Sequence, residues 1–140
     1  MAREATIRDG AKPLVQRRYT CATGTAIPKG TYLKLSGDNT VAASTTAGDI
    51  FVGFAHADVN NDTDTSFNTE TNVTADKGGV YELVASGAIA LGQKVKTAVP
   101  GNYVMAVTAT DVTSTSYAII IGHALEAATA GETINVEVYA

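Results

Sequence analysis

Apolar and polar residues alternate in short runs along most of this 140-residue chain. In the last run, Ile134, Val136 and Val138 alternate with more polar neighbours. This two-residue period is typical of a strand with one buried face. Residues 32–35 and 41–43 form two further runs. The Ser-Gly-Asp-Asn segment between them favours a tight turn, so the pair predicts a hairpin.

Other short apolar runs extend this pattern of strands. The further predicted strands cover residues 49–57, 80–88, 93–97, 103–108 and 117–127. Turn-forming residues separate the runs at intervals of about 8–12 residues, as in sandwiches and barrels. Residues 124–129 alone have helical propensity, and they are too few to form a stable helix in water. The pattern therefore predicts an all-β fold, a small β-barrel or β-sandwich.

The same pattern occurs twice in the chain. Residues 22–35 (ATGTAIPKGTYLKL) are echoed by residues 85–97 (ASGAIALGQKVKT), and residues 50–57 (IFVGFAHA) by residues 119–127 (IIIGHALEA). The matched positions are Gly24 with Gly87, Gly30 with Gly92, Val41 with Val104, and Gly53 with Gly122. We therefore expect two related β-rich halves, an organisation that favours an assembly protein over an enzyme.

The start of the chain differs from the rest in charge. Residues 1–18 carry five Lys or Arg against two acids, whereas the remaining 122 residues carry five Lys against twelve acids. Pro13 and the Asp9-Gly10 pair disfavour a helix there. We predict an extended basic arm over residues 1–19 and a β-rich domain over residues 20–140. The arm either docks on an acidic surface, attracts nucleic acid that the acidic body repels, or is a solvated chain end.

A polar segment over residues 58–79 interrupts the strands. It is interpreted as a surface loop or an edge hairpin. Its first acids and amides recur at every second position, as the oxygen ligands of calcium loops do. The candidate ligands are Asp58, Asn60, Asp62 and Asp64. Because Thr63 stands where such a loop requires Gly, we assign no metal site here.

Candidate catalytic groups are scarce. Cys21, His56 and His123 are the obvious ones, and no motif of a catalytic triad surrounds them. The two histidines fall in the two copies of the Gly-x-Ala strand, so they are candidates for equivalent positions. The lone cysteine cannot form an internal disulfide. We predict a protein that is not an enzyme and needs no cofactor.

Membrane and nucleic-acid partners are not expected. No apolar run approaches the roughly 18 residues that span a bilayer, and residues 1–18 do not resemble a secretion signal. We therefore expect synthesis in a cytoplasm. The acidic body also lacks the basic, aromatic-rich face of nucleic-acid-binding modules.

The second half of the chain carries a family resemblance. VYELVASGAIALGQKVKT at residues 80–97, followed by IIIGHALEAATAGETINVEVY at residues 119–139, resembles the head-decoration (capsid cement) proteins of tailed bacteriophages. AGDIFVGFA at residues 47–55 is similar to the same pattern. The resemblance covers residues 20–140.

The resemblance implies a homotrimeric virion protein, made in the host cytoplasm, that binds the outer surface of the expanded head. Its partner would be the major capsid protein, whose lattice it would stabilise. An arm that orders on docking could add a strand to a capsid subunit. The residues of that contact would be Arg3, Ile7, Arg8, Leu14, Val15, Arg17 and Arg18. A rival hypothesis is a virion fibre or adhesin module that binds through residues 58–79 with help from calcium.

Overall fold

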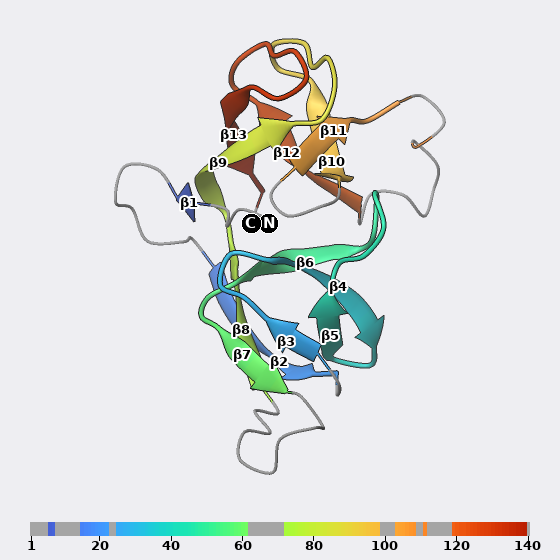
Figure 1. The fold of residues 1–140 in the computed structure, drawn as a ribbon, viewed down its shortest axis with the longest axis vertical. Coiled ribbons are helices and arrows are strands. Elements are labelled where there is room, and N and C mark those ends of the chain that lie inside the picture. The colour runs from blue at the N-terminus through green and yellow to red at the C-terminus, as the bar shows by residue number, and fades with distance from the viewer. Residues whose placement is uncertain are drawn as a thin grey trace.

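The protein is all-β, as the hydrophobic pattern predicts (Figure 1). The structure is a computed structural model, and it describes residues 6–7, 15–22, 25–61, 72–98, 103–108, 111 and 119–139. The described residues of each half form a barrel, and the two barrels lie one above the other in Figure 1. Strands β8 (Asn72–Lys77) and β9 (Gly79–Ala85) lead the chain from the first barrel into the second.

Five of the described strands close the first barrel. Their order around it is β2 (Val15–Cys21), β5 (Thr40–Ala43), β4 (Tyr32–Gly37), β6 (Phe51–Ala55) and β8. The predicted hairpin is the β4–β5 pair, and Asn39 adopts a positive φ of 50° in its turn. Strands β3 (Thr25–Ile27) and β7 (Val59–Asn61) form a separate pair, whose buried residues extend the core of this barrel.

The described strands of the second half form one sheet. Its order is β1 (Thr6–Ile7), β9, β11 (Tyr103–Ala106), β10 (Lys94–Ala98), β12 (Ile120–Ala124) and β13 (Thr133–Val138). Because β13 also pairs with β9, strands β9 to β13 close into a second barrel. The short strand β1 pairs with β9 from outside this barrel.

The two barrels have the same topology. Strand β2 runs parallel to β5 as β9 does to β11, and the other neighbouring pairs of each barrel are antiparallel. A bulge follows Leu33 in the β4–β6 pair and Val95 in the β10–β12 pair. Gly53 lies opposite Leu33, and Gly122 lies opposite Val95. The internal repeat expected from the sequence is therefore confirmed at the level of strand register.

The repeat extends to an ion pair that the sequence pattern did not predict. Lys34 on β4 lies 3.8 Å from Asp49, and Lys96 on β10 lies 2.9 Å from Asp111. In both barrels the aspartate also accepts a hydrogen bond from the amide three residues before it. Each pair therefore ties a barrel strand to the connection that follows the hairpin.

Tight backbone packing explains the matched glycines of β6 and β12. A Cβ on Gly122 would collide with the backbone of Glu137 on β13. On Gly53, which has a φ of 142°, a Cβ would lie 2.8 Å from the carbonyl oxygen of Asp76 on β8. Glycine is therefore required where this strand crosses its neighbour.

Each barrel has its own core. The interior of the first barrel is built from small and branched residues: Cys21, Ile27, Leu33, Val41, Ala55, Val59, Val73 and Ala75. The core of the second barrel includes Leu83, Val95, Val104 and Ile121, and it also takes in three aromatic residues of the first barrel. One face of β4 and β6 points inward and the other points toward the second barrel. On β6 the bulge shifts the alternation by one residue, so Phe51 and Phe54 share the face toward the second barrel.

Aromatic rings join the two barrels. Phe54 on β6 stacks on Tyr81 of β9 with ring centroids 4.4 Å apart, and Phe51 lies edge-on to Phe54. The Tyr32 hydroxyl donates a 2.9 Å hydrogen bond to the backbone oxygen of Tyr103. Burial raises the pKa of Tyr32 well above its ordinary value, as expected for a hydroxyl sealed in this interface.

Two boundaries expected from the sequence need correction. The arm assigned to residues 1–19 ends earlier, because Val15–Cys21 is a barrel strand paired along its length with β8. The polar segment assigned to residues 58–79 includes β8, whose residues Val73 and Ala75 face the core of the first barrel. Polar residues on the exposed face of both strands made the sequence resemble an arm and a loop. Residues 62–71, the middle of that segment, lie outside the described residues.

Candidate functional site

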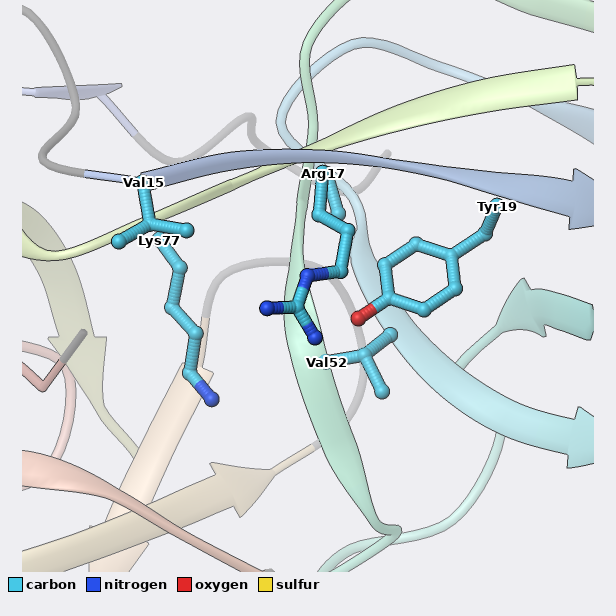
Figure 2. Close-up of a pocket in the computed structure, with 6 residues that line it drawn as sticks. Val15, Arg17, Tyr19, Val52 and Lys77 are labelled. Atoms are coloured by element: carbon cyan, nitrogen blue, oxygen red, sulfur yellow. The ribbon is translucent and has the colours of Figure 1, made fainter. Parts of the chain in front are cut away.

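A cleft of about 250 Å³ opens on the first barrel (Figure 2). Its walls come from β2, β6 and β8. The lining residues are Val15, Arg17, Tyr19, Val52, Ala75 and Lys77. Three of the lining side chains are apolar, two are cationic and one is a phenol. This composition suits a partner that carries negative charge.

Strand register brings these residues together. In the antiparallel β2–β8 pair, Val15 lies opposite Lys77 and Arg17 opposite Ala75. Residues two apart on a strand share a face, so Val15, Arg17 and Tyr19 line the same side of β2. Figure 2 shows them on that side, with the Tyr19 hydroxyl directed toward Arg17.

The cleft has an excess of positive charge. Arg17 is exposed and Lys77 is half-buried, and within the described residues neither forms an ion pair. Burial, followed by the nearby Arg17 charge, lowers the pKa of Lys77 from its ordinary value. The Lys77 ammonium lies 5.8 Å from the ring centroid of Phe51, so the cleft adjoins the interface between the barrels. An incoming anion would therefore relieve an unfavourable arrangement of like charges.

The acid next to Lys77 in sequence does not neutralise the cleft. Asp76 points to the opposite face of β8, where it accepts a 2.9 Å hydrogen bond from Gln16 and contacts His56 Nδ1 at 2.8 Å. Gln16 likewise belongs to the other face of β2, one residue before Arg17. The alternation of the two strands thus separates a polar network from a cationic cleft.

The candidate catalytic groups lie in separate places. Cys21 is buried in the core of the first barrel, and His56 follows β6 at the surface. His123 lies on β12 of the second barrel, where its ring contacts the Tyr139 hydroxyl at 3.0 Å and Glu137 at 3.1 Å. The repeat aligns His123 with Phe54, not with His56. The expectation that the two histidines are equivalent is therefore wrong by two residues.

The candidate calcium ligands are only partly covered by the structure. Asp58 accepts a 2.7 Å hydrogen bond from the backbone amide of Lys29. Asn60 lies on β7, while Asp62 and Asp64 fall outside the described residues. The described part of the chain holds no group of three or more His, Cys, Asp or Glu side chains arranged to bind a metal.

The candidate residues of the arm divide into three groups. Arg3, Arg8 and Leu14 lie outside the described residues. Ile7 is in β1, where it pairs with Tyr81 of β9. Val15, Arg17 and Arg18 are in β2, and two of them line the cleft. Tyr19 and Lys77 were not among the site residues predicted from the sequence. Each alternates with polar residues, Tyr19 in the predicted arm and Lys77 in the predicted loop.

Comparison with solved structures identifies a protein of similar fold. The head fiber gp8.5 N base of bacteriophage phi29 matches with a TM-score of 0.51 over 89% of this chain and 92% of that chain. The two share the fold. Sequence identity is 17%. No family model matches the chain, and no curated protein sequence does either. Among the described residues, no helix has the length and apolar character needed to cross a membrane.

Proposed function

We propose that the protein is a structural component of a tailed-bacteriophage head that binds the outer surface of the assembled shell. The observation that carries the proposal is the fold, which this chain shares over 89% of its length with the base of a phage head fibre. The resemblance of residues 80–97 and 119–139 to head-decoration proteins points to the same particle. Both arguments favour a protein that acts by binding, without a cofactor or catalytic site.

As a decoration protein, the chain stabilises the expanded head by mass action. A protein that binds the expanded lattice and not its precursor lowers the free energy of the expanded state by RT ln(1 + L/Kd) per site, where L is its free concentration. The partner is the major capsid protein, and the chain binds as a homotrimer. Neither nucleic acid nor membrane takes part in this association.

Sedimentation with heads tests the proposal. Purified chain is mixed with empty heads of its own phage, prepared before and after expansion, and both are pelleted. We expect the chain in the pellet with expanded heads only, and these heads should melt at a higher temperature when the chain is bound. Selective decoration would be refuted if the chain pelleted equally with both kinds of head. It would also be refuted if the chain pelleted with neither.

A fibre base is the second candidate, because the similar structure is itself the base of a head fibre. A base would anchor a further segment, whereas a decoration protein acts alone. Copy number in purified virions separates the two, since a decoration protein occupies equivalent sites all over the lattice. For the adhesin version of this candidate, melting with and without calcium is decisive. A melting temperature that does not respond to calcium would exclude a calcium-assisted binding module.

A further inference from the structure

The internal repeat exposes an edge of the first barrel. In the second barrel, β11 covers one edge of β9 at Val84 and Ala85, and β1 covers the preceding part at Tyr81 and Glu82. In the first barrel, β5 covers the corresponding edge of β2 only at Thr20 and Cys21. No described strand pairs with the preceding part of that edge.

The register identifies the uncovered residues. Cys21 pairs with Val41 as Ala85 pairs with Val104, so Arg17 and Arg18 correspond to Tyr81 and Glu82. The Thr20 amide donates to Asn39 on this edge, at 2.9 Å. Since backbone groups alternate between the two edges of a strand, the amide and carbonyl of Arg18 point to the same edge. An unpaired edge of this kind is a template for another strand.

The uncovered edge borders the cationic cleft. Strand β2 contributes Val15, Arg17 and Tyr19 to the cleft, and Lys77 reaches it from the next strand. A strand added beside β2 would direct every second side chain to this face. Acidic side chains there would meet two cationic side chains that have no ion-pair partner within the described residues.

We propose that this edge and the cleft form a binding site for an extended acidic segment of another protein, which adds to β2 as an antiparallel strand and directs a carboxylate toward Arg17 and Lys77. Backbone hydrogen bonds supply affinity, and the cleft supplies specificity for negative charge. The orientation follows from β1, which pairs antiparallel with the equivalent edge of β9. The inference does not depend on the identity of the particle proposed above.

Charge argues against the chain's own arm as the occupant. Residues 1–14, which precede β2, carry three Lys or Arg against two acids, so the arm of a second copy would bring a net positive charge to Arg17 and Lys77. In addition, Thr6–Ile7 already pairs with β9. An acidic strand from a different protein fits the charge of the cleft better.

Peptide binding to the full-length chain tests the proposal. The probe is a fluorescein-labelled octapeptide of alternating Glu and Val, and the control peptide carries Lys in place of Glu. We expect anisotropy titrations to show binding of the Glu peptide, weakening with salt, and at least tenfold weaker binding of the Lys peptide. Equal binding of the two peptides would overturn the charge assignment.

Variants of the chain locate the site. Arg17→Gln should weaken binding of the Glu peptide about tenfold, which corresponds to about 1.4 kcal/mol, because the peptide carboxylate loses its cationic partner. Lys77→Gln should weaken it at least threefold. Arg18→Gln removes the same charge one residue away on the opposite face, and it should change binding less than threefold. Unchanged binding in both cleft variants would refute the site.

Two further measurements separate strand addition from simple attraction between charges. A Glu peptide with N-methyl groups at alternate residues cannot donate to the edge of β2, so it should lose binding. Retained binding would refute strand addition. A chain with Asp62, Asp64 and Glu70 changed to their amides should bind the peptide as the natural chain does. If the peptide bound only to that variant, residues 62–71 of the chain itself would be the segment that occupies the site. This result would overturn the proposal of a separate partner.

Discussion

Single residues at equivalent places in the two barrels are under similar constraints. Gly53 and Gly122 are constrained by the neighbouring strand, whereas Gly87 has no atom within 4 Å of where its Cβ would be. Lys34 and Lys96 hold equivalent ion pairs, although Lys96 lies closer to its aspartate. The repeat therefore identifies constrained positions, and Gly87 supplies an unconstrained glycine as a control.

Substitution of the β12 glycine should be strongly destabilising. In Gly122→Ala the new methyl group collides with the backbone of Glu137, and backbone cannot move without separating β12 from β13. We expect a loss of about 2–4 kcal/mol in the free energy of unfolding, measured by urea denaturation. Gly87→Ala is the control and should change stability by less than about 0.5 kcal/mol. Similar effects of the two substitutions would contradict the close approach of the strands.

The ion pair of the second barrel should make stability depend on pH. Hydrogen bonds from Lys96, and then from the Thr108 amide, lower the pKa of Asp111 from 3.8 to about 2. A carboxyl group whose pKa is lower in the folded state stabilises the protein above the unfolded pKa, and this contribution disappears as pH falls through the folded pKa. Asp111→Asn should therefore be less stable than the natural chain above pH 4, and the difference should shrink toward pH 2. Urea denaturation across this range measures it, and a difference independent of pH would contradict the ion pair.

At the scale of elements, the contact between the barrels depends on aromatic residues that occur in one copy of the repeat and not in the other. Phe54 of β6 corresponds to His123 of β12, and Tyr32 of β4 corresponds to Lys94 of β10. The aromatic residues of the first barrel are buried against the second, whereas His123 and Lys94 remain at the surface of the molecule. The same strand topology therefore presents a buried interface in the first barrel and a solvent-facing surface in the second.

Removal of one ring should test how strongly the two barrels are coupled. Phe54→Ala removes the stack on Tyr81 and leaves a cavity among Tyr32, Phe51 and Tyr81, so we expect a loss of about 3–5 kcal/mol. His123→Ala, at the equivalent position, should cost less than about 1 kcal/mol. Denaturation followed by near-UV circular dichroism of the tyrosines measures both. Equal losses would mean that Phe54 does not bridge the barrels.

At the scale of the whole molecule, the sequence predicted the all-β class and the tandem halves, because alternation and matched glycines are local signals. It did not predict that β2 and β8 close the first barrel. Gln16, Arg18, Thr74 and Asp76 occupy the outward face of these strands and make them resemble an arm and a loop. The cleft was missed for the same reason, since Arg17 and Lys77 meet only after the two strands pair across 60 residues of chain.

Two truncations should separate the arm from the barrel. Removal of residues 1–14 leaves β2 whole and takes away β1, whose two residues pair only with β9. We expect this chain to keep the strand spectrum of the natural protein by far-UV circular dichroism and to lose little stability. Removal of residues 1–18 also deletes most of the β2–β8 pairing, which closes the first barrel, so the chain should unfold at much lower urea. Head binding must therefore be compared with the shorter truncation, because a loss after removal of residues 1–18 reports on folding. Equal stability of the two truncated chains would contradict the assignment of β2 to the barrel.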